Sequence, residues 1–224
     1  MLVREMGSTQ RKMDLGRLAL MPVFTFFLTL NSLAVYKDLK GVYPFNLNKA
    51  VEFTHHLLIV CFYILLVLLY FLRTSPISTS KSPVTNIIAI VTTFIPFTIP
   101  LLGRHLSVDP FSALISSVII IFGMLLAIFA LLVLGKNLSI IPQARKLVNT
   151  GPYRWVKHPL YLGELICVLG IVVGEITTPK IIIFILFSAA QIYRSLREEK
   201  LLISTFPEYQ EYFLKTRRFV PGIF

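Results

Sequence analysis

The sequence predicts an all-α, polytopic membrane protein with about six membrane helices, the last two of which form a helical hairpin. The first observation is composition: 55% of the 224 residues are hydrophobic and only 15% are charged, whereas a soluble domain is about one quarter charged. The second is that several uncharged apolar runs approach the ~20 residues that cross a bilayer as an α-helix. Both features indicate a chain that lies within a membrane.

The apolar runs follow one another in chain order. The predicted membrane helices are Leu18 to Tyr36, Phe53 to Leu72, Val84 to Leu102, Phe111 to Leu134, Leu160 to Val173 and Ile181 to Tyr193. The third contains Pro96 and Pro100, which predict a kink or a frayed end. The last two are short for full spans and are separated by GEITTPK, so we expect a hairpin that is either spanning or re-entrant. The connector RTSPISTSKSP fits neither a helix nor a strand pattern.

The net charge of +11 could indicate a nucleic-acid partner, but the basic residues lie in short loops between the spans. Topology signals and contacts with membrane lipids explain them better, and no nucleic acid is expected. With six crossings, most of the 22 Lys and Arg residues fall on the side of both termini, so both termini are predicted to be cytoplasmic. Cys61 and Cys167 lie inside apolar runs without metal-ligand spacing, and no metal is expected.

A change in composition after Gly135 divides the chain into N-terminal membrane helices, residues 1–135, and a C-terminal region, residues 136–224. This second region opens with a polar loop, LVNTGPYRWVKHPLYLG, that leads into an apolar helix. Arg194, Glu198 and Glu199 end the hairpin. Because antiparallel helices joined by a short turn bring their open ends together, we expect the loop and this cluster at one membrane surface. The residues alone predict a membrane-embedded site for a polar ligand.

Two motifs carry a family resemblance. GPYRWVKHPLYLG, followed about thirty residues later by R-x-x-x-E-E-x-x-L-x-x-x-F-P-x-Y-x-x-Y, resembles the C-terminal signature of the isoprenylcysteine carboxyl methyltransferase (ICMT) family and the related phospholipid methyltransferases. The similarity covers roughly Lys136 to Pro221. It implies an S-adenosylmethionine-dependent methyltransferase built of membrane helices, without a Rossmann domain.

The resemblance also implies roles for residues. The implied cofactor pocket contains Lys146, Leu147, Val148, Gly151, Tyr153, His158, Pro159, Leu160, Tyr161 and Glu198. Arg194 is implied to bind the substrate and to be catalytic, and Glu199 is a second catalytic candidate. The implied acceptor is a lipophilic or prenylated molecule that enters from the bilayer. An acceptor carboxylate can be held by Arg194 in a bidentate fork without a general base, whereas an amine would need a base such as Glu199 or His158.

Two alternatives to the methyltransferase remain open. The stretches HPLYLGE and KTRRFVP also resemble the sterol reductases, which would imply NADPH as the cofactor. A non-enzymatic membrane scaffold or transporter is the other alternative. It predicts intramembrane polar residues in the first four spans, which contain little beyond Ser, Thr and Asn31.

Overall fold

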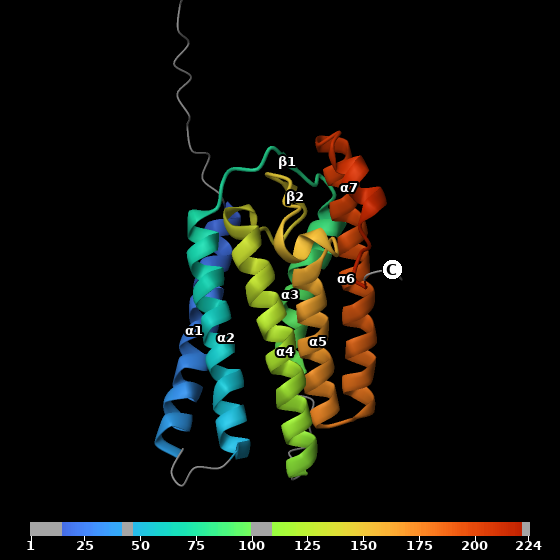
Figure 1. The fold of residues 1–224 in the computed structure, drawn as a ribbon. Coiled ribbons are helices and arrows are strands. Elements are labelled where there is room, and N and C mark those ends of the chain that lie inside the picture. The colour runs from blue at the N-terminus through green and yellow to red at the C-terminus, as the bar shows by residue number, and fades with distance from the viewer. Residues whose placement is uncertain (1–14, 42–46, 100–108, 221–224) are drawn as a thin grey trace, which may run out of the picture.

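The computed structural model describes residues 15–41, 47–99 and 109–220, and these residues form a helical bundle (Figure 1). The helices of the described chain are α1 (Leu15–Gly41), α2 (Leu47–Leu72), α3 (Pro83–Thr98), α4 (Pro110–Leu134), α5 (Pro159–Gly174), α6 (Thr178–Thr205) and α7 (Tyr209–Lys215). The described parts of the connections hold two short 3₁₀ helices, η2 (Gly135–Asn137) and η3 (Gly151–Arg154), and two strands, β1 (Ser78–Thr79) and β2 (Gln143–Ala144). The predicted all-α fold is confirmed.

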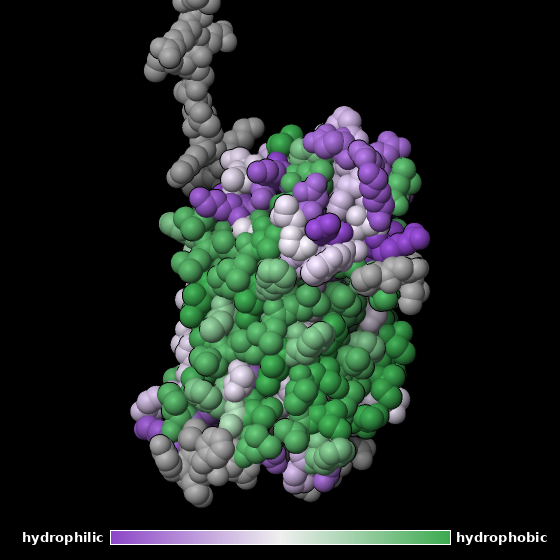
Figure 2. Space-filling model, viewed as in Figure 1, coloured by the Kyte–Doolittle hydropathy of each residue, from purple (hydrophilic) through white to green (hydrophobic). Residues whose placement is uncertain are grey.

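Within the ranges that the structure describes, four helical segments are long and apolar enough to cross a membrane. They are Leu20–Lys40, Leu47–Leu72, Pro110–Asn137 and Thr178–Thr205. Helices α3 and α5 have 16 residues each and are about 24 Å long, which is shorter than the ~30 Å hydrocarbon core. Apolar side chains cover the middle of the bundle, and polar residues gather at the end that carries β1, β2 and α7 (Figures 1 and 2). We call this end the loop end.

The predicted hairpin is present, since α5 and α6 run antiparallel and only residues 175–177 separate them. As predicted, α6 continues past the apolar run, and it ends at Thr205. Helix α3 continues through Pro96 and ends at Thr98, whereas Pro100 and Leu102 lie outside the described residues. The termini predicted to be cytoplasmic, residues 1–14 and 221–224, also lie outside them.

One local prediction was wrong. The connector RTSPISTSKSP contains β1, which pairs antiparallel with β2. The Ile77 N–H donates to the Ala144 carbonyl at 2.7 Å, and the Ser80 N–H donates to the Pro142 carbonyl at 3.0 Å. The hydrogen-bond partners come from a distant part of the chain, so the local sequence pattern could not reveal the strand. The same pairing fixes the loop after α4 against the loop after α2.

The contact between α4 and α5 is a backbone contact. A Cβ atom added to Gly163 would lie 2.8 Å from the Ala127 nitrogen and 2.8 Å from the Gly123 oxygen. Both distances are shorter than a Cβ atom can approach a backbone atom of a neighbouring helix. Small residues at a helix crossing allow this kind of packing in membranes. The Ser116 hydroxyl also donates to the Gly170 carbonyl at 2.8 Å. Helix α4 therefore fixes the position of α5, whose first turn enters the candidate site.

Candidate active site

The predicted polar loop forms a compact turn on top of α4. Gly151 has a φ angle of +56°, a left-handed conformation that favours glycine, and an added Cβ would lie 2.8 Å from a methyl group of Val133. The turn continues as η3, where the Tyr153 carbonyl accepts a hydrogen bond from the Tyr212 hydroxyl at 2.5 Å. Gly151 therefore shapes the loop, and α7 holds it from the other side.

The C-terminal tail binds the end of the same loop. The Lys157 N–H donates to the Arg217 carbonyl at 2.8 Å, and the His158 N–H donates to the Arg218 carbonyl at 3.1 Å. His158 is the residue before α5, and Pro159 is the first residue of the helix, a position where the missing N–H of proline has no cost. The tail thus fixes the backbone from which the His158 ring projects.

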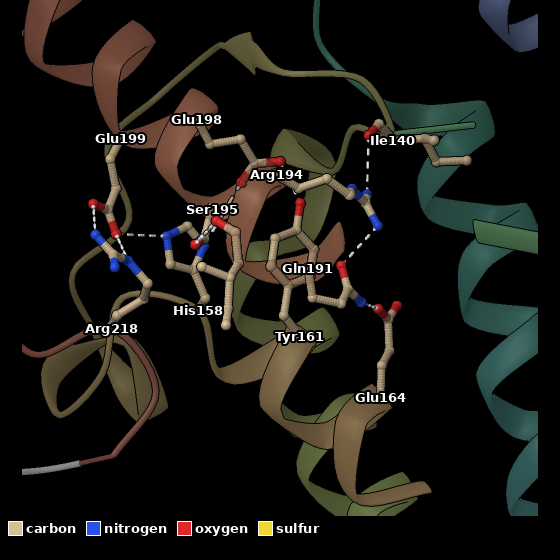
Figure 3. Close-up of polar contacts among 11 residues, drawn as sticks. Ile140, His158, Tyr161, Glu164, Gln191, Arg194, Ser195, Glu198, Glu199 and Arg218 are labelled. Carbon is tan, nitrogen blue, oxygen red and sulfur yellow. Dashed lines mark hydrogen bonds and ion pairs between the residues drawn. The ribbon is translucent and has the colours of Figure 1, made fainter. Parts of the chain in front are cut away.

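Glu199 lies at the centre of a buried ion-pair cluster (Figure 3). Arg218 donates to its two carboxylate oxygens, from Nε at 2.9 Å and from Nη2 at 2.8 Å. The Nε2 atom of His158 lies 3.1 Å from the same carboxylate, whose side chain is only 3% exposed. The structure therefore gives Glu199, a predicted catalytic residue, an anchoring contact with the tail.

Glu198 lies on the other side of His158. Its carboxylate accepts a hydrogen bond from the Tyr161 hydroxyl, and the second carboxylate oxygen is 3.7 Å from His158 Nδ1. The rings of His158 and Tyr161 stack with their centroids 5.3 Å apart and an interplanar angle of 6°. Three residues predicted to bind the cofactor, from the loop, α5 and α6, are thus brought into one cluster.

Arg194 lies on the opposite side of Tyr161 from the Glu199 cluster (Figure 3). Its Nη1 donates to Gln191 Oε1 at 3.0 Å, its Nη2 donates to the Ile140 carbonyl at 3.0 Å, and its guanidinium carbon is 4.7 Å from the Tyr161 ring centroid. Gln191 in turn donates to Glu164 at 2.5 Å. Sequence reasoning missed Glu164 and Gln191. A carboxylate within an apolar helix was the available signal, because such groups are costly in a membrane and usually functional.

Two cavities meet at Tyr161. The loop-end cavity, of about 110 Å³, lies above α5. The predicted cofactor residues that border it are Lys146, Leu147, Val148, Tyr153, His158, Leu160, Tyr161 and Glu198. Gly151 and Pro159 are not among its lining residues. The membrane cavity, of about 450 Å³, lies between the helices and is bordered by Glu164 and Arg194. Leu138, Ser139, Leu160 and Tyr161 line both cavities, whereas Glu199 lines neither of the two.

The charges of the loop-end cavity are mixed. Glu198 supplies a carboxylate, and Arg145, Lys146 and Lys157 supply cations. Burial raises the pKa of the Tyr153 phenol, with a further contribution from nearby Glu198, so Tyr153 is a neutral hydrogen-bonding group at physiological pH. Partial burial lowers the pKa of Lys157, and Glu199 opposes this effect. The cavity can therefore bind a ligand that carries both an anionic and a cationic group. Arg145 was not predicted from the sequence.

Parts of this chain are similar in sequence to known proteins. The profile of the PEMT family, described as phospholipid methyltransferase, matches residues 111–209. The match begins in α4, earlier than the Lys136 expected from the motifs. The cobalt-zinc-cadmium resistance protein CzcN of Cupriavidus metallidurans is 36% identical over 80 residues, which are 34% of this chain and 36% of that protein. The nickel-cobalt-cadmium resistance protein NccN of Alcaligenes xylosoxydans xylosoxydans is 33% identical over 84 residues, 36% of this chain and 38% of that protein. The similarity thus spans little more than a third of either curated relative.

The fold has a solved counterpart. The structure of the eukaryotic intramembrane Ras methyltransferase ICMT superposes with a TM-score of 0.53 at 19% identity, over 92% of this chain and 83% of that chain. At 92% of this chain, the match extends into the N-terminal membrane helices, for which the motifs offered no resemblance. The predicted resemblance is therefore confirmed: the chain has an ICMT-like fold of membrane helices, and its residues 111–209 match the phospholipid methyltransferase family.

Proposed function

We propose that the protein transfers a methyl group from S-adenosylmethionine to a lipophilic acceptor. The observation that carries the proposal is the junction of the two cavities at Tyr161. A polar cavity at the loop end and an apolar cavity between membrane helices share one wall, so a water-soluble donor and a lipid-soluble acceptor can meet there. The family match and the ICMT fold support the same reaction class.

The loop-end cavity suits the chemical groups of the proposed cofactor. S-adenosylmethionine supplies a methyl group on a sulfonium cation. Glu198 can bind its ammonium group or ribose hydroxyls, while His158 and Lys146 can bind its carboxylate. The Tyr153 and Tyr161 rings can contact the adenine or the sulfonium. Because ligand sites are usually larger than ~300 Å³, binding would have to displace side chains around the 110 Å³ cavity. The exposed Lys146 side chain is the most easily moved of them.

The membrane cavity suits the acceptor. A guanidinium has five N–H donors, and the hydrogen bonds of Arg194 to Gln191 and Ile140 use only two of them. The remaining donors can hold a carboxylate head, as in an isoprenylcysteine or another lipid acid, while the apolar body lies between the helices. A carboxylate nucleophile needs no general base, so orientation by Arg194 would be the main contribution of the protein.

Calorimetric titration of the detergent-purified protein with S-adenosylhomocysteine tests the proposal. We expect micromolar binding that is lost in Glu198→Gln and retained in Glu211→Gln, a matched change of an exposed carboxylate that pairs with Lys215. NADPH is the comparison ligand. Binding of NADPH with no binding of S-adenosylhomocysteine would contradict the methyltransferase proposal and favour a reductase.

A further inference from the structure

The membrane cavity has a second polar region far from Tyr161. Along α2 its lining extends from Leu66, which packs against the core cluster that contains Leu160, to His55. Eleven residues of α-helix correspond to about 16 Å. At the far end the lining includes Asn31 from α1 with His55 and His56 from α2. We call these three residues the distal polar end. Between it and the Tyr161 junction the wall is largely aliphatic and aromatic.

The distal polar end is held in place by an ion pair between α1 and α2. Nδ1 of His56 lies 2.6 Å from the Asp38 carboxylate, and the two side chains are half-buried, at 22% and 25% exposed. This contact orients the ring, and Nε2 of His56 has no partner among the residues that the structure describes. Asn31 donates through Nδ2 to the Phe27 carbonyl at 2.7 Å, which leaves its Oδ1 available. The His55 ring lies 4.2 Å from the His56 ring.

A wholly apolar tail would fit this end poorly. It would take polar atoms of His56 and Asn31 out of water without replacing their hydrogen bonds, which is unfavourable. A hydroxyl group matches them, because it both donates and accepts. It can donate its single proton to Asn31 Oδ1 or to an unprotonated His56 Nε2, and it can accept a hydrogen bond from a protonated Nε2. Leucine or phenylalanine at these positions would suit an isoprenoid or alkyl end better.

We propose that the distal polar end binds a hydroxyl group at the far end of the acceptor. The substrate class is then an amphiphile with polar groups at both ends: the head that receives the methyl group and a hydroxylated tail about one cavity length away. The inference rests on the proposed function for the identity of the head, and it adds a specificity site that the methyl-transfer chemistry does not require.

Binding of matched lipid pairs to the S-adenosylhomocysteine-saturated protein tests this site. The pairs are dodecanoic and ω-hydroxydodecanoic acid, with their shorter and longer homologues, and dodecanol with dodecanediol to make the result independent of the head. One hydrogen bond corresponds to roughly a three- to tenfold difference in affinity. We expect the hydroxylated member to bind about that much more tightly at the chain length that fits the cavity.

Substitutions test whether the distal polar end causes the preference for the hydroxylated lipid. His56→Leu and Asn31→Leu should remove the preference, His56→Gln should retain part of it, and Leu57→Ala, a change of an exposed neighbour on α2, should leave it intact. Equal affinity within every pair, or binding of neither member, would overturn the inference. So would variants that lower only thermal stability, because that result would mean that His56 and Asp38 merely join two helices. If the wild-type protein does not bind S-adenosylhomocysteine at all, that result would instead refute the proposed function.

Discussion

Replacing Arg218 with glutamine should detach the C-terminal tail from the site without unfolding the bundle. The change removes both hydrogen bonds to Glu199, whose side chain is 3% exposed, while that of Arg218 is 15% exposed. Removing one partner of a buried ion pair costs about 3–5 kcal/mol. His158 remains at 3.1 Å from Glu199, and Arg218 is not fully buried. We therefore set the cost of Arg218→Gln below this range, at about 2 kcal/mol.

The lost stabilisation favours a local opening in which the C-terminal tail separates from the loop. About 2 kcal/mol corresponds to a roughly 30-fold larger open population. Two amides report it directly, because the N–H groups of Lys157 and His158 donate to carbonyls of the tail at Arg217 and Arg218. In hydrogen–deuterium exchange resolved to single amides, both should exchange about 30-fold faster in Arg218→Gln, whereas amides in the middle of α4 should not change.

The neighbouring substitution Arg217→Gln is the matched control, since that side chain is exposed and its carbonyl contact is made by the backbone. Glu199→Gln should raise the same two rates, and the double variant should add little to either single change because both remove one interaction. Unchanged exchange at Lys157 and His158 in Arg218→Gln would refute the reasoning. It would mean that the backbone contacts alone hold the tail.

Two further predictions concern packing and polar contacts within the bundle. Gly163→Leu should lower the thermal midpoint in detergent, because even a Cβ atom would lie 2.8 Å from the Ala127 backbone and overpacking costs about 1–3 kcal/mol; an unchanged midpoint would contradict the α4–α5 contact. Gln191→Leu should be destabilising by about 1–3 kcal/mol, because it leaves half-buried Glu164 without its donor and Arg194 without one acceptor. The double variant Glu164→Leu/Gln191→Leu should recover much of that loss in the same melting assay, and no recovery would argue against the bond between them.

The bundle was predictable because its helices are encoded locally. Each predicted apolar run corresponds to one of α1 to α6, and the short GEITTPK segment led directly to the α5–α6 hairpin. Strand β1 and the docking of the tail on Lys157 and His158 depend on backbone pairing between distant segments. Such pairing leaves no periodic pattern in either partner, so a reading of local sequence does not reveal it.

The sequence predicted which residues lie near one another at the candidate site better than it predicted which of them contact each other. His158, Tyr161 and Glu198 lie together in the structure, as the motifs predicted. The partners of Glu199 and Arg194 were not foreseen, because Arg218 comes from the tail and Gln191 from one helical turn before Arg194. Spacing identifies residues that share a helix face, but the choice of partner is made by packing in three dimensions. That choice is what separates anchoring Glu199 from cavity-lining Glu198.

The polar residues at the membrane cavity argue for function on energetic grounds. A well-packed apolar pair often replaces a buried ionic or polar pair with no loss of stability, and an ionisable group within a membrane segment is costly. Glu164 and Gln191 on one side of the cavity and His56 with Asp38 at the other therefore do not have to be there for the fold. One member of each pair, Glu164 and His56, borders the same 450 Å³ cavity, and a largely apolar wall separates the two. A ligand with two polar ends would bind the polar groups at both ends of the cavity, whereas the stability of the fold requires neither group.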